Sequence, residues 1–370
     1  MIKKNLRKKH LDQHYRPFFA KHKLNHHALY AAILSAIFAF PTCTAATGND
    51  FIVYTGSVGV VDPNAINRSL DADVLVSGAS TLNIIGRTVT SVTLGPDSSM
   101  ENIFNTYAIR DFKDHSLSID SDSNVVIQGG TALAVELKYV NERGEEISHI
   151  VPAKGIYGLS VGSGRIVNEG KLTVKTGYCD YTNGIENLAT AGKRASITNK
   201  GTLNFLGGSS SETNSESGLN GAYALNNLAY GNGAYGELNN TGLILIKGGD
   251  SQFRYGIQTL AFNETEDEGA DAAEALLDNA GHIEIKGGSS LNSVGVFAFS
   301  SGEHAKATIT NKSGGEMLVS GGSGIDQAEA SEKGAYGIFA FALNGAQTIY
   351  NLQENSSASI RGGDQNILTE

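Results

Sequence analysis

Apolar residues alternate with other residues in short runs along most of this chain, and the runs recur as a repeating unit. Alternation over four to six positions is the period of a half-buried strand, and no comparable repeat occurs at helical spacing. Each unit carries an Ile or Leu, any residue, and then an Asn. The six copies of this phrase end at Asn168, Asn199, Asn240, Asn279, Asn311 and Asn351. The pattern therefore predicts a series of repeated short strands.

Two further features surround each Asn. Downstream come two apolar residues separated by one position and then a glycine pair, as in Ile244, Ile246 and Gly248-Gly249. Upstream lies a step that most often reads aromatic, glycine, aliphatic. We align the copies of this step as Tyr157-Gly158-Leu159, Asn183-Gly184-Ile185, Tyr223-Ala224-Leu225, Tyr255-Gly256-Ile257, Val294-Gly295-Val296 and Tyr336-Gly337-Ile338. Each unit thus reads as three short strands.

The spacing of the units separates a constant part from a variable part. Successive asparagines are 31, 41, 39, 32 and 40 residues apart, which looks irregular. The distance from each Asn to its closing glycine is nevertheless 9 residues in the first four copies and 11 and 12 in the last two. The strands therefore form a constant core, and the loops absorb the variation in length.

Three strands per unit with tight turns predict an all-β fold, a right-handed parallel β-helix (solenoid) of about seven coils. Asn tolerates the left-handed backbone that a sharp bend demands, and its amide can bond to the same amide one coil away. A β-sandwich would explain many short strands but not one fixed Asn per unit. A leucine-rich repeat would need a helical side to each unit, and none is visible.

The remaining segments complete the predicted organisation. A weaker seventh unit begins at Tyr107-Ala108-Ile109 and ends at Gly130. Residues 131–154 carry alternating apolar residues on both sides of Asn141-Glu142-Arg143-Gly144, which predicts a β-hairpin insertion. Residues 47–106 are strand-like but off the pattern. Because a solenoid needs an atypical end coil over its first strand edges, we predict an N-terminal β cap there and repeats over 107–370.

Residues 1–46 have the features of a cleavable extended signal peptide. The first 27 residues carry eight Lys and Arg against one acid, Asp12, and residues 28–40 are apolar or small. Small residues follow up to Ala46. A basic start, an apolar run too short to span a membrane and a small-residue exit describe a secretory signal. We therefore expect export from the cytoplasm.

Charge and cysteine content limit the classes of partner and the disulfides that are possible. Of 28 Lys and Arg and 38 Asp and Glu, residues 1–46 hold eight and one, which leaves a net charge of −17 after cleavage. Such a charge argues against nucleic acid as a partner. Cys43 lies in the signal region and Cys179 is alone, so no disulfide within the mature chain is possible.

Extended signal, Gly/Asn/Ser-rich β-helical repeats, scarce Cys and acidic charge together resemble the passenger region of a bacterial type V autotransporter of the adhesin-like kind. The resemblance covers residues 49–370 and implies display at the cell surface or outer membrane, or release outside. It also implies a translocation barrel as a partner. The chain ends at Glu370, seven residues after Gly363, with no room for that barrel. We expect either a truncated chain or further sequence or a partner that covers the last coil.

Two candidate surfaces emerge, and neither has a specific catalytic signature. The first is an acidic loop that would face a ligand, formed by Glu264, Glu266, Asp267, Glu268 and Asp271. Clustered carboxylates bind divalent cations or act as acid and base, but a solvated loop is the preferred interpretation. The second is the set of step tyrosines, Tyr157, Tyr223, Tyr255 and Tyr336, for which an interior position is favoured over a sugar-stacking stripe. We predict no catalytic residue, metal or cofactor.

Two functional classes remain. The first is a surface-exposed structural or adhesive protein whose partner is a glycan or a host or cell-surface receptor. The alternative is a secreted carbohydrate-active β-helix enzyme, either a polysaccharide lyase or a glycosidase. Two carboxylates about 5 to 10 Å apart on neighbouring strands of one outward sheet face would favour the enzyme.

Overall fold

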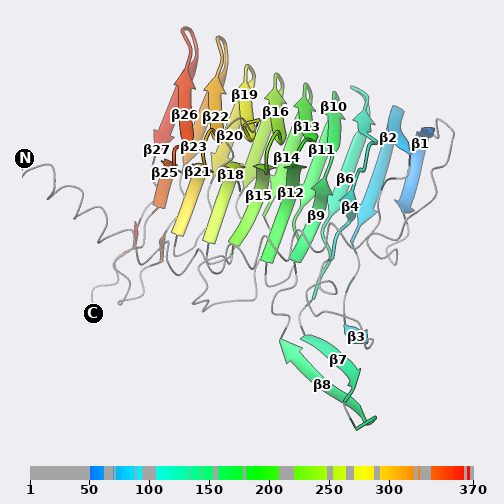
Figure 1. Ribbon diagram of the computed structural model, residues 1–370. Coiled ribbons are helices and arrows are strands. Elements are labelled where there is room, and N and C mark those ends of the chain that lie inside the picture. Colours follow the sequence, from blue (N-terminus) through cyan, green and yellow to red (C-terminus); the bar gives the residue numbers. More distant parts are fainter. Residues whose placement is uncertain are drawn as a thin grey trace, which may run out of the picture.

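A computed structural model of the chain describes residues 51–61, 70, 72–86, 88, 90–93, 106–132, 134–141, 143–152, 157–177, 181–207, 221–247, 253–263, 271–286, 292–320, 324–325, 335–361 and 365–366. Within these ranges all regular secondary structure is β-strand. The strands pair in parallel from one coil to the next, and the chain forms a parallel β-helix, which confirms the predicted fold class (Figure 1).

Three rows of strands run along the stack, and we call each row a sheet, although the second and third rows are halves of one hydrogen-bonded sheet joined through β2 (Asp73–Ile85). The long sheet consists of β4 (Ile109–Asp111), β9 (Tyr157–Ser163), β12 (Tyr181–Thr190), β15 (Gly221–Tyr230), β18 (Phe253–Phe262), β21 (Asn292–Ser301) and β25 (Ala335–Leu343). The asparagine sheet consists of β5 (Leu117–Ile119), β10 (Arg165–Asn168), β13 (Arg194–Asn199), β16 (Tyr235–Asn240), β19 (Glu274–Asn279), β22 (Lys306–Asn311) and β26 (Gln347–Leu352). The exit sheet consists of β6 (Asn124–Gln128), β11 (Lys171–Lys175), β14 (Thr202–Leu206), β17 (Leu243–Lys247), β20 (His282–Lys286), β23 (Glu316–Ser320) and β27 (Ser357–Arg361). Each coil passes through the three sheets in this order.

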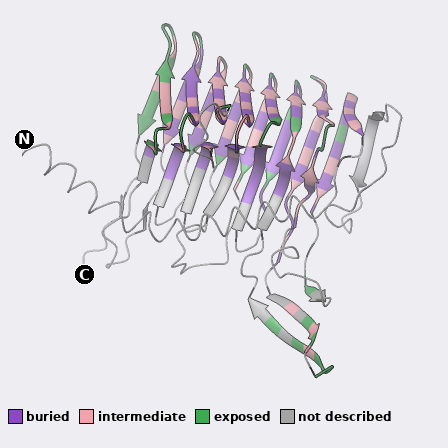
Figure 2. Ribbon diagram, viewed as in Figure 1, coloured by how far each residue is buried: buried purple, intermediate pink, exposed green. Residues whose placement is uncertain are grey.

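Columns of aliphatic side chains fill the interior. In the asparagine sheet the inward column contains Leu117, Ile166, Ile197, Leu238, Leu277 and Ile309, each at most 1% exposed. In the exit sheet it contains Val125, Leu172, Leu203, Ile244, Ile283 and Met317, all fully buried. Full burial of such a side chain contributes about 1.5–3 kcal/mol. Figure 2 shows the resulting alternation of buried and intermediate residues along the strands.

Two segments extend the stack or leave it. Strand β2 (Asp73–Ile85) runs along both the asparagine and exit sheets, with Val74 opposite Leu117 and Leu82 opposite Val125. Strand β1 (Phe51–Val61) pairs in parallel with β2. Strands β7 (Ala134–Val140) and β8 (Glu146–Pro152) form an antiparallel hairpin that projects from the stack, with β3 (Ser91–Thr93) beside β7 (Figure 1). A short pair, β24 (Gly324–Ile325) and β28 (Gln365–Asn366), lies near the end of the chain.

The upstream step needs one correction. Val161, and not Leu159, lies opposite Ile185, and Ile109 lies opposite Val161. The equivalent of Gly184 is therefore Ser160, because the register follows the buried aliphatic residue and not the aromatic residue before it. The closing glycine pairs Gly248-Gly249, Gly287-Gly288, Gly321-Gly322 and Gly362-Gly363 lie outside the described residues.

One glycine of the step illustrates why a side chain is excluded there. A Cβ added at Gly256 would lie 2.5 Å from Ile285 Cγ2 and 2.5 Å from the carbonyl oxygen of Gly295. At Gly256 the long sheet therefore packs directly against Ile285, a second inward-facing residue of the exit-sheet strand β20.

Replacing Gly256 with valine is expected to lower the free energy of unfolding by about 3 kcal/mol, because neither the backbone oxygen nor the packed isoleucine can move far. Urea unfolding followed by far-ultraviolet circular dichroism measures the change. The matched control is Ala342→Val, an exposed position of the same sheet, for which we expect a change within about 0.5 kcal/mol. Equal stability of the two variants would contradict the packing described here.

Candidate functional site

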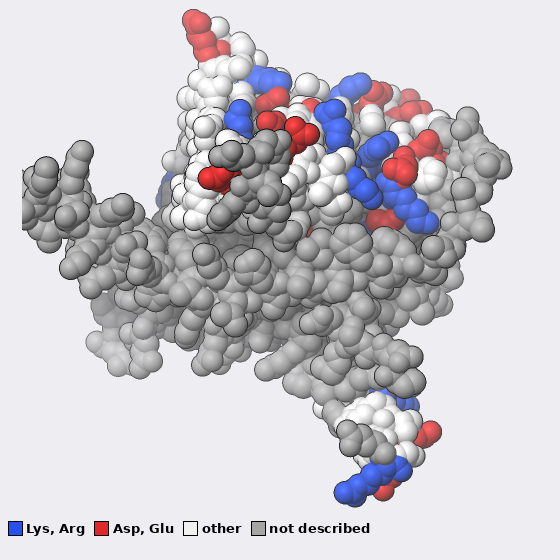
Figure 3. Space-filling view, in the orientation of Figure 1, with Lys and Arg blue, Asp and Glu red and all other residues white. Residues whose placement is uncertain are grey.

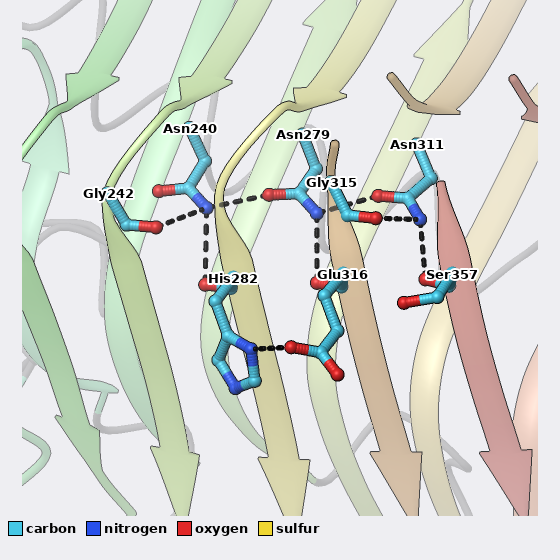
Figure 4. A network of polar contacts seen from close by, with 8 residues as sticks. All are labelled: Asn240, Gly242, Asn279, His282, Asn311, Gly315, Glu316 and Ser357. Carbon is cyan, nitrogen blue, oxygen red and sulfur yellow. Dashed lines mark hydrogen bonds and ion pairs between the residues drawn. The ribbon is translucent and has the colours of Figure 1, made fainter. Parts of the chain in front are cut away.

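Five buried asparagines stand one above another where the asparagine sheet turns into the exit sheet. The strand register places Asn168, Asn199, Asn240, Asn279 and Asn311 opposite one another. Each is at most 1% exposed. At all four steps the Nδ2 of one asparagine donates to the Oδ1 of the next over 2.7 Å, and Figure 4 shows the two steps from Asn240 to Asn311. We call this set the asparagine ladder.

The second hydrogen of each Nδ2 reaches the backbone. Asn240 donates to the carbonyl oxygen of His282 at 3.3 Å, and Asn279 donates to that of Glu316 at 3.1 Å. Both acceptors belong to the following coil, where the exit sheet begins. Every amide nitrogen thus joins its own bend to the next, whereas the Oδ1 of Asn168, at the first position of the ladder, is buried without a hydrogen-bond partner.

Asn351 does not belong to the ladder, which corrects the sequence alignment. Leu352 lies opposite Asn311, whereas Asn351 lies opposite Thr310 and is exposed. Tyr350 takes the inward position opposite Ile309. Because side chains alternate with a period of two, this one-residue slip turns Asn351 outward. At the other end Ile119 lies opposite Asn168.

A second buried amide pair was not predicted from the sequence. Asn187 of β12 donates to Asn227 of β15 over 2.8 Å, and both side chains are buried. Asn227 also donates to the carbonyl oxygen of Leu276 at 2.8 Å, which connects the long sheet to the asparagine sheet. The available signal was an Asn two residues after the aliphatic residue of the step. This Asn occurs in only two neighbouring units, and Thr259 takes the equivalent position in the next unit.

The outward face of the asparagine sheet carries a mixed polar and aromatic cluster. The Arg194 guanidinium lies 4.3 Å from the centre of the Tyr235 ring. Arg194 Nη2 is 3.8 Å from Glu237 Oε2, and Asn239 Nδ2 donates to Glu237 Oε1 over 2.7 Å. On the next strand Glu274 lies opposite Tyr235. We call the set Arg194, Tyr235, Glu237, Asn239, Glu274 and Asp278 the Tyr235 surface.

Several neighbouring charges act on the pKa of Tyr235 at this surface. Partial burial raises the pKa of the Tyr235 phenol, and the carboxylates of Glu237, Glu274 and Asp278 raise it further, whereas Arg194 opposes them. Asp278 is itself held by Lys312, whose Nζ lies 2.7 Å from Oδ2. The carboxylates therefore sit among cations and are not isolated.

The exit sheet carries an acid–base pair on its outward side. His282 Nδ1 lies 2.7 Å from Glu316 Oε2 on the neighbouring strand (Figure 4). The two side chains are 30% and 47% exposed, so this is a solvated pair of modest strength. Beside it, the Lys286 ammonium holds the pKa of the Glu284 carboxyl below its usual range.

Among the residues that the structure describes, one carboxyl-bearing side chain is buried. Glu186 of β12 is 6% exposed, and burial raises its pKa from 4.5 to about 7. It lies opposite Asn226, which in turn lies opposite Gln258. Next to this row, Leu188, Leu228 and Leu260 form an apolar cluster separate from the main core.

Most of the two surfaces predicted from the sequence falls outside the described residues. This applies to Glu264, Glu266, Asp267 and Glu268 of the acidic loop, whereas Asp271 is described and exposed. The backbones of Tyr223 and Tyr255 lie opposite each other, as expected for equivalent positions. The side chains of Tyr157, Tyr223, Tyr255 and Tyr336 are not among those described.

The described part of the chain lacks two features. It contains no group of three or more His, Cys, Asp and Glu side chains placed to hold a metal ion. It also contains no helix long and apolar enough to span a membrane.

Comparisons with known proteins assign this chain to no family. No family model matches the chain, and no curated protein matches it significantly. Among solved structures, the chain is similar to the crystal structure of a TibC-catalysed hyper-glycosylated TibA fragment, at 12% identity and a TM-score of 0.15. The match covers 84% of this chain and 98% of that one. A TM-score this low supports no inference about function.

Proposed function

We propose that this chain is an exported β-helical passenger, displayed at the cell surface or secreted, with a structural and adhesive role and no catalytic activity. The observation that carries the proposal is the unbroken register of the coils, fixed by the aliphatic columns and the asparagine ladder. A stack of this kind is stiff and presents extended outward faces, which suits a protein that binds other surfaces.

The sequence supports the exported location. Residues 1–46 carry the basic start and apolar run of a secretory signal, and the remaining chain is strongly acidic. Fold alone does not determine function, so the adhesive role needs its own test.

Export is testable with a reporter. Residues 1–46 fused to an alkaline phosphatase that lacks its own signal are expected to give active enzyme in a Gram-negative host, because this reporter needs an oxidising compartment. The double substitution Ile33→Arg and Leu34→Arg is expected to lower reporter activity at least about tenfold, since each Arg costs about 2.5 kcal/mol or more in an apolar segment. The control exchanges the same residues as Ile33→Leu and Leu34→Ile. Equal activity of all three fusions would refute export through this segment.

A carbohydrate-active enzyme is the second candidate, and one observation favours it. Glu237 lies opposite Leu276, so Glu274 and Asp278 are its diagonal neighbours on the next strand, and diagonal neighbours in a sheet are about 7–8 Å apart. Side chains at such positions can bring their carboxyl groups to the separation of paired glycosidase carboxylates, about 5 to 10 Å. Against it, Glu237 and Asp278 are engaged by Arg194 and Lys312, whereas a general acid must hold a proton in a desolvated setting.

The two candidates differ in a direct assay. Purified residues 47–370 incubated with neutral and acidic polysaccharides are expected to release no new reducing ends and no unsaturated products. Release that is abolished by Glu237→Gln and by Asp278→Asn would establish the enzyme and overturn the non-catalytic proposal.

A further inference from the structure

We infer that the Tyr235 surface is a binding site for an uncharged glycan. The inference rests on the proposed adhesive function and specifies both the place and the chemical class of its ligand. Four lines of observation carry it: position, pre-organisation, charge and the mixture of polar and apolar groups.

The six side chains occupy neighbouring outward positions on three strands. Arg194 of β13 lies opposite Tyr235 of β16, which lies opposite Glu274 of β19. Asn239 and Asp278 form a second such row. Neighbouring outward side chains are about 4.8 Å apart from strand to strand and about 6.6 Å apart along a strand. They therefore form a grid of hydrogen-bonding groups. An extended ligand can lie across such a grid.

The groups are held in place before any ligand arrives. Glu237 Oε1 accepts a hydrogen bond from Asn239 Nδ2, and Glu237 Oε2 lies 3.8 Å from Arg194 Nη2. The Arg194 guanidinium lies over the Tyr235 ring. The Arg194 side chain nevertheless stays 68% exposed. A guanidinium has five donor hydrogens, and an amide that donates through Nδ2 keeps Oδ1 as an acceptor. Fixed donors and acceptors reduce the ordering cost of binding.

The Tyr235 surface holds one cation and three carboxylates, and two lysines beside it, Lys306 and Lys312, balance the local charge. Arg194, Lys306 and Lys312 stand against Glu237, Glu274 and Asp278, with Lys306 opposite Glu274 and Lys312 paired to Asp278. Figure 3 likewise shows positive and negative groups interspersed on the described part of the face in view. A site without net charge gives no advantage to a polyanion or a cation. Hydroxyl groups, which donate and accept, match it better.

An apolar element completes the match. Tyr235 and Leu276 are partly exposed and are diagonal neighbours on adjacent strands. Sugars present C–H groups between their hydroxyls, and an aromatic residue with a polar tip suits a surface that is half apolar and half wet. The cluster therefore offers both kinds of contact within one footprint.

The test uses purified residues 47–370 on an immobilised glycan panel. The panel holds glucose-, galactose-, mannose- and N-acetylglucosamine-terminated glycans, each beside a sialylated or sulfated counterpart. We expect binding to at least one neutral glycan, and at least about tenfold weaker binding for Tyr235→Ala and for Asn239→Ala, which corresponds to loss of one strong contact. The matched control Glu284→Gln changes an outward carboxyl of the exit sheet and should leave binding unchanged. Thermal unfolding of each variant verifies that it is folded, and Glu274→Gln replaces any variant that is not.

Each outcome decides the inference. Binding that is unchanged in folded Tyr235→Ala and Asn239→Ala places the site elsewhere and overturns the inference, while the adhesive proposal stands. Binding only to sialylated or sulfated glycans, or to none of the panel, also overturns it. Cleavage of a bound glycan would instead overturn the non-catalytic function itself, so the two failures are distinguishable.

Discussion

Replacing Asn240 with aspartate is expected to lower the free energy of unfolding at pH 7 by about 4 kcal/mol. The change keeps the shape of the side chain but removes the donor to Asn279 Oδ1, to the His282 carbonyl and to the Gly242 carbonyl. Each buried group left without a partner costs about 1–3 kcal/mol, and a buried carboxylate beside carbonyl oxygens costs more. Urea unfolding followed by circular dichroism measures the loss.

Two comparisons isolate the ladder from a general effect of the substitution. Asn351→Asp makes the same chemical change outside the ladder at an exposed site, and we expect it to shift stability by no more than about 0.5 kcal/mol. The Asn240→Asp variant should also recover part of its stability in acid, because a protonated carboxyl donates one hydrogen bond. Similar losses for both variants would show that the ladder does not stabilise the stack.

The second large effect concerns Glu186. We expect Glu186→Gln to be more stable than the wild type by about 3 kcal/mol above pH 7. The pKa of this carboxyl is about 7 in the folded chain against an ordinary 4.5, a difference of about 2.5. Each pKa unit corresponds to about 1.36 kcal/mol. Glutamine keeps the size of the side chain and its place in the row with Asn226 and Gln258, and removes the buried charge.

The sign of this pH dependence follows from proton binding. Because the folded state holds the Glu186 proton more tightly than the unfolded state, its contribution is fully present below pH 4.5 and is lost as the pH rises to about 7. The advantage of Glu186→Gln should therefore be small at pH 4, grow between pH 4.5 and 7, and stay constant above. Unfolding measured across this range tests it, with Glu354→Gln at an exposed turn as the control. A pH-independent difference would mean that Glu186 is not held protonated by burial.

The fold was predictable because similar residue types recur at equivalent positions of successive coils. A buried aliphatic residue and a buried Asn two positions later recur in five units, and the downstream apolar pair stays in register in all six. The two register errors arose where a residue of the expected type stood near the structurally equivalent position: Leu159 lies two residues before Val161, and Asn351 lies one residue before Leu352. The period-two alternation of a strand reveals the one-residue slip at Asn351, but it cannot reveal the two-residue slip at Leu159, which leaves the side chain on the same face.

The Tyr235 surface was not predictable from the sequence. Arg194, Tyr235 and Glu274 are separated by 41 and 39 residues and share no common residue type. Their proximity depends on loops of different length returning the chain to the same register. Identical residues in a ladder reveal such proximity, but unlike residues do not. The sequence instead pointed to the acidic loop of residues 264–271, whose carboxylates lie close together in the chain.

All four side-chain bonds of the asparagine ladder have the same polarity, with the nitrogen toward the C-terminal end. Deletion of residues 241–279 would remove one whole coil and leave Asn240 to donate to Asn311 as it now donates to Asn279. Duplication of the same segment would add a coil with matching bonds on both sides. Recombination between these asparagine codons can thus lengthen or shorten the rod in steps of about 4.8 Å, which gives evolution a way to tune reach without redesigning the interior.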